Sequence, residues 1–475
     1  MSFTAPEFLL FLAVVLLLYR ALPGRFRWAV LLPASYFFYA CHNVWLLSLI
    51  LLTTLTSYLC ARGMETAVGK RRRFLLALDL LVCLGILFIF KYLDFALGGV
   101  FHLMQLLGGQ GSFEGFHLLL PMGISFYVFQ TLSYTLDVYR GTVPAEKHLG
   151  YFALFVVFFP QLVAGPIERP GDLLPQLHRA PTAGTDDIAC GLRYLVRGYA
   201  KKVLIADFLA TFVDAAYADA SAAGGAALLL ATVFFAAQIY CDFSGYSDIA
   251  LGCARLMGIR LTENFRRPYA AVTVRDFWRR WHISLTRWFT DYLYIPLGGS
   301  RKGIPRQCGN FLIVFLVSGL WHGANVTFLI WGALHGVYLV AETLLARNRE
   351  APSGFCPLRR IVTLALVCFA WIFFRAESLP HAVQVLGTIV TDFRPENLLS
   401  GLAAGVPELV AAVLLLALCP MLEGLPLLGG EGTEGATRSS VKTVALYFLL
   451  ITAVVLCRCI ALSGGGDTAF LYFQF

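Results

Sequence analysis

Charged residues are scarce in this chain of 475 residues: they make up 14% of it, against roughly 25% in a soluble globular protein. The sequence also lacks a CxxC pair among its twelve cysteines, a Gly-rich phosphate-binding loop and any internal repeat that we can find. These absences argue against a disulfide framework, a metal site and a repeat-built transporter. The N-terminus has no basic segment followed by a small-residue cleavage site, so we expect the first apolar run to be retained.

Hydrophobic residues make up 58% of the sequence and come in long blocks. Because a span needs roughly 20 apolar residues, the blocks predict an all-α integral membrane protein with about 11–13 membrane helices in one domain, 1–475. Several blocks are short, which favours broken or re-entrant helices around a cavity. The Gly-rich stretch 427–440 has no apolar periodicity and is predicted to be a flexible loop.

Loop charges predict the orientation of the first spans. The residues before Pro6 carry no Lys or Arg, whereas Arg20, Arg25 and Arg27 follow the first apolar run and a second basic cluster, 62–73, follows the third. Positive charge collects in cytoplasmic loops. We therefore expect the N-terminus outside the cytoplasm and both basic clusters inside.

Positive charge is concentrated between Arg255 and Arg306, where eleven Arg or Lys stand against three acids. One interpretation is topology and contact with anionic membrane lipids. The other is a docking site for an anionic donor of the coenzyme A type, since guanidinium groups suit phosphate oxygens. The candidate donor-binding residues are Arg266, Arg267, Arg279, Arg280, Arg301 and Lys302.

Within this block, residues 275–297 carry aromatic and aliphatic side chains at helical spacing, interleaved with arginines. The pattern predicts an amphipathic helix lying at the membrane interface. His282 lies on it near the polar side, either as a solvated histidine or as support for an active site.

Two histidines stand in apolar segments. Burial of an imidazole there costs free energy, so such a residue is normally paired, hydrated or functional. His322 lies in the run GLWHGAN and His335 in WGALHG. On an unbroken helix the two would be turned about 220° apart, so they converge only if the helix breaks after His322. His335 is either a second site residue or a helix-packing group, and Asn325 either orients His322 or caps the next helix.

Two aspartates, Asp242 and Asp248, follow the apolar run that ends near Ile239. Ionisable groups at such a place are functional candidates. The alternative is structural, with both carboxylates paired with arginines.

These segments resemble the membrane-bound O-acyltransferase superfamily, in the bacterial branch that contains the membrane subunits of alginate and related exopolysaccharide O-acetyltransferases. The resemblance covers nearly the whole chain. It rests on PMGISFY (121–127), LDVYRG (136–141), FFPQLVAGPI (158–167), YCDFSGYSD (240–248), NFRRPY (264–269), DFWRRWH (276–282), WHG (321–323), WIFFRA (371–376) and YFQF (472–475).

The resemblance implies a ring of helices around a central tunnel in which a catalytic histidine, matched by His322, meets the acyl donor. It implies an O-acetyltransferase of the bacterial inner membrane with a periplasmic N-terminus. The donor would be cytoplasmic acetyl-CoA, with no bound cofactor or metal. The other partners would be membrane lipids, a periplasmic acetyltransferase protein and an extracytoplasmic polysaccharide, and no nucleic acid is expected.

Transfer of an acyl group from a thioester to a hydroxyl requires that the hydroxyl lose its proton as it attacks the thioester carbonyl. It also requires that water be excluded from the site. His322 is therefore predicted to be the general base, with a transient acyl-imidazole as a variant. Peptidoglycan O-acetylation and D-alanyl transfer to teichoic acid stay open within this class. A proton-coupled transporter that uses the intramembrane histidines and aspartates is the alternative from another class.

Overall fold

The computed structural model describes all residues except 112, 164, 346–355 and 425–475. Helices and no strands form the secondary structure of this part of the chain, which confirms the all-α class. The predicted loop 427–440 and the terminal motif 472–475 lie outside the described residues. Contacts group the chain into two compact units, each described by itself below. The single integral-membrane domain stays a prediction.

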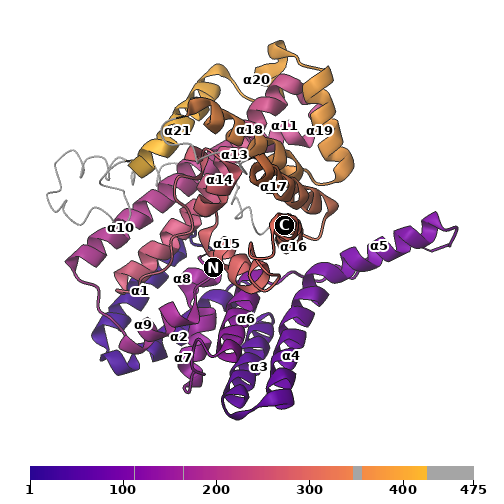
Figure 1. Ribbon diagram of the computed structural model, residues 1–475. Helices are drawn as coiled ribbons and strands as arrows, with labels where there is room; N and C mark the ends of the chain where they lie inside the picture. The colour runs from indigo at the N-terminus through magenta and orange to yellow at the C-terminus, as the bar shows by residue number, and fades with distance from the viewer. Residues whose placement is uncertain (112, 164, 346–355, 425–475) are drawn as a thin grey trace. The chain divides into compact units, whose positions relative to one another are not determined.

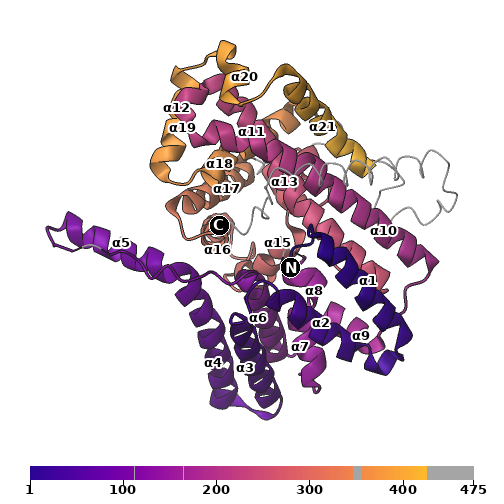
Figure 2. The same ribbon diagram turned by 180° about the vertical axis from the view of Figure 1, so that it is seen from behind.

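The first unit comprises residues 1–188 and 253–262. Its helices are α1 (Pro6–Ala21), α2 (Trp28–Ala40), α3 (Leu47–Thr66), α4 (Gly69–Leu87), α5 (Leu93–Leu106), α6 (Ile124–Arg140), α7 (Leu149–Val157), α8 (Phe159–Leu162) and α9 (Pro170–Arg179). Helices α3, α4 and α6 pack on one another, and α5 extends away from them (Figures 1 and 2).

Polar contacts join the helices of this first unit where they pack. The hydroxyl of Ser57 on α3 donates to the carboxyl of Asp79 on α4 at 2.6 Å, and both side chains are fully buried. Hydrogen bonds of this kind hold helices together where the surroundings offer no water. The outer faces are apolar, with Leu10, Leu17 and Leu81 at least 70% exposed, as suits contact with lipid.

The second unit comprises residues 189–252 and 263 onward. Its helices are α10 (Thr185–Tyr199, mostly in this unit), α11 (Asp207–Ala218), α12 (Ala220–Ala223), α13 (Gly225–Leu256, also mostly here), α14 (Val274–Arg280), α15 (Ile283–Phe289), α16 (Ile304–His322), α17 (Val326–Leu345), α18 (Pro357–Arg375), α19 (Leu379–Thr391), α20 (Leu398–Gly401) and α21 (Val406–Gly424). Helices α16 and α17 form a close pair, and α14 and α18 pack on α17.

Five described helices are long and apolar enough to cross a membrane, or six if the bent pair Pro395–Gly401 and Val406–Cys419 is one span. The five are Leu47–Thr66, Gly69–Leu106, Gly225–Leu256, Val326–Leu345 and Pro357–Arg375. The protein is thus a multi-pass membrane protein. The expectation of about 11–13 membrane helices concerns the whole chain, of which residues 346–355 and 425–475 lie outside the described part, and it stays a prediction. Several apolar runs fold into shorter helices: α1 has 16 residues and α7 has 9, against the roughly 20 that a span needs.

Candidate active site

His322 is the last residue of α16, and the expected break follows it at once. Gly323 has an extended backbone, and α17 begins at Val326. Asn325 holds this turn: its Oδ1 accepts from the backbone N–H of Thr327 at 3.1 Å, and its Nδ2 donates to the carbonyl of Glu377 at 2.8 Å. Both polar ends of Asn325 are therefore used in capping, which favours the capping interpretation over a contact with substrate.

Aromatic rings surround the His322 imidazole. The centroids of Trp321 and Trp331 lie 4.9 Å from it, and that of Phe374 lies 5.4 Å from it, all edge to face. The side chain is 4% exposed. We call these four residues the His322 box. An imidazole enclosed in this way is shielded from bulk water.

Two glycines allow α16 and α17 to approach closely enough to form the box. A Cβ on Gly319 would meet the carbonyl oxygen of Phe328, and a Cβ on Gly332 would meet the carbonyl oxygen of Phe315. The obstacle at each position is backbone, which cannot rotate away. Small residues at such crossings are the usual means of close helix packing in membranes.

Gly332→Ala is therefore expected to push the two helices apart and misplace His322. We expect a loss of roughly 1–3 kcal/mol of stability, together with a fall in catalytic activity. The matched control is Gly309→Ala on the neighbouring helix α16, where an added Cβ meets nothing within 4 Å. Thermal unfolding of both purified variants checks this. Equal midpoints would contradict the close-packing argument.

His335 lies on α17 and is completely buried. Trp278 of α14 donates its indole N–H to His335 Nδ1 at 3.2 Å, so the neutral ring keeps its proton on Nε2. The ring of Trp331 lies 5.1 Å from His335 and 4.9 Å from His322, so one indole contacts both histidines. The break after His322 thus brings the two histidines to the same tryptophan, as the convergence argument required.

The segment 275–297, expected as one amphipathic helix, instead forms the two short helices α14 and α15 followed by a π-helical turn, Thr290–Tyr294. The break has a cause outside the segment, at Asn264. Its carbonyl accepts from Ile283 N–H at 3.0 Å, and its Oδ1 accepts from Ser284 N–H at 3.2 Å. These bonds replace those that a continuous helix would make.

His282 stands at this break in the left-handed region, with φ of 44°. It is fully buried, so the interpretation as a solvated histidine is wrong. Its ring lies 4.7 Å from that of Phe243 and 5.9 Å from that of Trp321, the neighbour of His322. Burial lowers the pKa of His282 to about 3, and the ring is therefore neutral near pH 7. Its contact with Trp321 suits support of the site.

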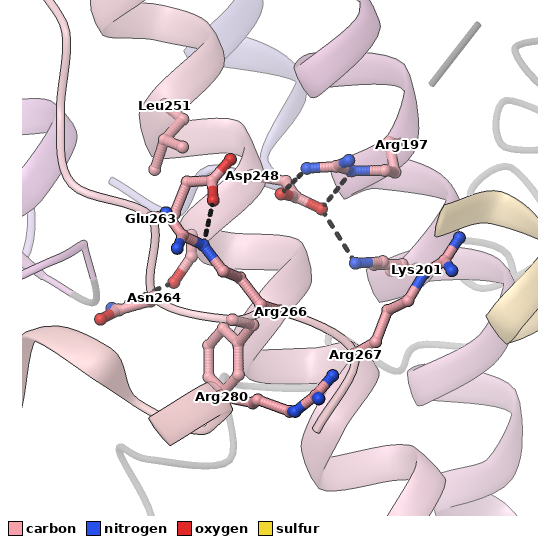
Figure 3. Close-up of a pocket in the computed structure, with 11 residues that line it drawn as sticks. Arg197, Lys201, Asp248, Leu251, Glu263, Asn264, Arg266, Arg267 and Arg280 are labelled. Atoms are coloured by element: carbon pink, nitrogen blue, oxygen red, sulfur yellow. Dashed lines mark hydrogen bonds and ion pairs between the residues drawn. The ribbon is translucent and has the colours of Figure 1, made fainter. Parts of the chain in front are cut away.

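A basic pocket of about 290 Å³ lies in the second unit (Figure 3). It contains three of the arginines predicted to bind the donor. The charged residues that line it are Arg197, Lys201, Asp248, Glu263, Arg266, Arg267 and Arg280. Five cations against two anions give the pocket an excess of positive charge, which suits a phosphate-bearing ligand.

The cations of the basic pocket differ in how they are paired. Arg266 pairs with Glu263 at 2.8 Å, and Arg280 pairs with Asp276, also at 2.8 Å. Arg267 has no carboxylate within ion-pair distance among the residues described. Its guanidinium is thus the most available to a ligand, and it carries no dashed contact in Figure 3.

The remaining predicted donor-binding residues lie outside the basic pocket. Arg279 is exposed on α14. Arg301 and Lys302 are exposed in the turn before α16. The chain therefore brings together Arg266, Arg267 and Arg280 and separates them from the other three.

The aspartates of α13 are both buried and paired. Asp248 accepts from Arg197 Nε at 2.8 Å and lies 3.1 Å from Lys201 Nζ. Asp242 lies 2.6 Å from Lys202 Nζ. Both carboxylates neutralise cations from α10 and the segment that follows it, which favours the structural alternative, although Asp248 also lines the basic pocket.

Sequence reasoning missed Arg197 and Lys201 as pocket residues. Their four-residue spacing places both on one helix face and was a usable signal. Trp278 and Phe374 were also missed as neighbours of the histidines, and no local pattern indicates them. No group of three His, Cys, Asp or Glu residues able to hold a metal occurs in the part of the chain that the structure describes.

Comparison with known proteins identifies the family. A model of the MBOAT family, membrane-bound O-acyltransferases, matches residues 145–379, which include the His322 box and the basic pocket. The chain is also 40% identical over 498 residues to the probable alginate O-acetylase AlgI of Pseudomonas putida, covering 100% of both chains. The chain belongs to the membrane-bound O-acyltransferase family. It is therefore an enzyme, an O-acyltransferase.

More distant relatives mark out the range of this family. The peptidoglycan O-acetyltransferase of Helicobacter pylori is 36% identical over 392 residues, 76% of this chain and 73% of the relative. The teichoic acid D-alanyltransferase of Bacillus subtilis is 25% identical over 280 residues, 56% of this chain and 71% of the relative. The relative that matches over the full length is thus named a probable alginate O-acetylase. The relatives with the other two activities match a smaller share of this chain.

Proposed function

We propose that this enzyme passes an acetyl group from cytoplasmic acetyl-CoA across the membrane for O-acetylation of an extracytoplasmic polysaccharide such as alginate. The observation that carries the proposal is the enclosed imidazole of His322 at the helix break. The full-length 40% identity to an alginate O-acetylase supports the choice of acyl group and acceptor.

His322 acts as the general base in this proposal. It removes the proton of the acceptor hydroxyl while the oxygen attacks the thioester carbonyl, the C–S bond breaks, and the leaving thiolate takes the proton from the imidazolium. The aromatic rings of the box keep water from competing for the thioester. A transient acyl-imidazole is the variant.

A narrow passage to His322 is part of the proposal, because a side chain that is 4% exposed cannot be reached by a polymer. A pantetheine arm from one side and a slender hydroxyl from the other fit such a passage. We therefore propose that a periplasmic acetyltransferase protein receives the acetyl group and completes its transfer to the polysaccharide. The inner membrane, with the N-terminus in the periplasm, is the proposed location.

The basic pocket is the proposed site for the phosphates of acetyl-CoA. Arg267 offers a guanidinium without a carboxylate partner among the described residues, and Arg280 and Arg266 stand beside it in the pocket lining. No resident cofactor is part of the proposal, and the donor is a substrate.

Arg267→Gln is expected to raise KM for acetyl-CoA about tenfold with little change in kcat, because one charge-assisted contact to phosphate is lost in ground state and transition state alike. The matched control is Arg301→Gln, an exposed arginine outside the pocket. Steady-state acetyl transfer with varied acetyl-CoA is the measurement. An equal rise in KM for both variants would remove the pocket from the proposal.

The acceptor is tested in the host. Deletion of the gene should remove ester-linked acetyl groups from the secreted polysaccharide and leave those of peptidoglycan unchanged, and the intact gene should restore them. Loss from peptidoglycan instead would favour the activity named for the Helicobacter pylori relative. Membership in an acyltransferase family favours an enzyme over the proton-coupled transporter that the sequence alone left open.

A further inference from the structure

A second cavity of about 470 Å³ lies in the second unit, between α13, α18, α21 and the short turn Pro268–Ala270. Apolar side chains line most of it, among them Val233, Ala237, Leu364 and Leu416. Its size falls within the roughly 300–1,000 Å³ of small-molecule sites. No residue of the His322 box lines it, and of the residues proposed above to bind acetyl-CoA only Arg267 also lines this cavity. We call it the α13–α18 cavity.

The α13–α18 cavity has exposed apolar residues at its edge. Val233 on α13 is 41% exposed and Leu364 on α18 is 37% exposed. Both helices are long and apolar enough to cross a membrane. A ligand that enters between them comes from the region of the lipid chains. Ala236 and Ala237, which are small, leave the space on the α13 side.

Two arginines line the same cavity. Arg360 lies in the first turn of α18, where that span begins. Arg267 caps the short turn Pro268–Ala270. Helix ends of spans lie near lipid headgroups. Guanidinium groups bind phosphate oxygens through paired hydrogen bonds. An apolar cavity with arginines in its lining suits a ligand that has an acyl chain and an anionic head.

Tyr240 adds a polar contact inside the cavity lining. The residue is 2% exposed, and its hydroxyl has no hydrogen-bond partner among the described residues. A buried hydroxyl left without a partner costs free energy. The ester carbonyl of a glycerolipid is an acceptor of the right kind for it.

We propose that the α13–α18 cavity binds one anionic phospholipid, with an acyl chain along Ala237 and Leu364 and its phosphate at Arg360. Coenzyme A is a less suitable occupant, because the walls are mainly apolar and Val233 and Leu364, at the edge, belong to membrane helices. The proposal is independent of the acetyl acceptor and of the role of His322.

The experiment titrates the purified full-length protein, in a neutral detergent, with phosphatidylglycerol while its thermal unfolding midpoint is measured. Phosphatidylcholine with the same acyl chains, inorganic phosphate and coenzyme A are the comparison ligands. A ligand that binds the folded state raises the midpoint. We expect phosphatidylglycerol to raise it at concentrations at which the other three do not.

Two variants and two matched controls locate the effect. Arg360→Gln should weaken the phosphatidylglycerol response about tenfold, as expected for one charge-assisted contact, whereas Arg359→Gln, exposed and outside the cavity, should not. Ala237→Phe should fill the cavity and abolish the response, whereas Leu229→Phe, exposed on the same helix, should preserve it. If Ala237→Phe does not fold, the comparison of Arg360→Gln with Arg359→Gln alone tests the proposal.

Several results would overturn the proposal. An equal response to phosphatidylcholine would show that the cavity does not select an anionic headgroup. A response to inorganic phosphate alone would show that binding does not require the acyl chains of a lipid. A response to coenzyme A that Ala237→Phe removes would assign the cavity to the donor. Equal responses of Arg360→Gln and Arg359→Gln would exclude the arginine assignment. Because acetylation is not the readout, none of these results bears on His322.

Discussion

Replacing His322 with alanine or glutamine is expected to lower acetyl transfer by roughly 10²–10⁴-fold, the contribution typical of a positioned general base. His322 is the last residue of α16, and its imidazole is surrounded by the three aromatic rings of the His322 box. Glutamine keeps much of the volume and a hydrogen-bonding end but cannot accept a proton near neutral pH. Both variants should therefore fail in turnover while KM for the donor stays close to that of the parent.

The measurement is ester-linked acetyl on the polysaccharide in the deletion strain carrying each variant, together with acetyl transfer by purified protein. His102→Gln is the matched control, an exposed histidine on α5 in the other unit. Unfolding midpoints of all variants separate loss of the base from loss of the fold. A folded His322→Gln protein with undiminished transfer would exclude His322 as the base.

The sequence predicted the parts of the site that depend on local pattern. The run Gly323–Asn325 indicated a helix break, and the break is present because an extended Gly323 and the Asn325 cap end one helix and start the next. The concentration of arginines between Arg255 and Arg306 left open either a topological role with lipid contact or a donor-binding site, and three of the six candidate residues line one pocket. These features are set by neighbours within a few residues, and sequence reasoning is strongest at that range.

The parts that the sequence did not predict depend on distant contacts. Trp278 and His335 are 57 positions apart, and their hydrogen bond exists only because α14 packs on α17. Asn264 interrupts the segment 275–297 from outside it, so the helical spacing of its aromatic residues predicted one helix where there are two.

The paired aspartates of α13 lead to the second large effect. Asp248 is 6% exposed and neutralises two cations, Arg197 and Lys201, that are themselves nearly buried. Asp248→Asn keeps the shape of the side chain and removes the negative charge that Asp248 places beside both cations. Breaking a buried pair from one side costs about 3–5 kcal/mol, so we expect a large fall in the unfolding midpoint and poor recovery of folded protein.

Asp214→Asn is the matched control, because Asp214 pairs with Arg375 through a carboxylate side chain that is 62% exposed. An exposed pair contributes about 0–1 kcal/mol, so this variant should unfold close to the parent. The double variant Asp248→Asn with Lys201→Met also removes one of the two cations and should recover part of the loss, which a double-mutant cycle measures. Equal effects of Asp248→Asn and Asp214→Asn would mean that burial does not set the cost. In that case the α13 aspartates would have to be explained by function instead of by charge pairing.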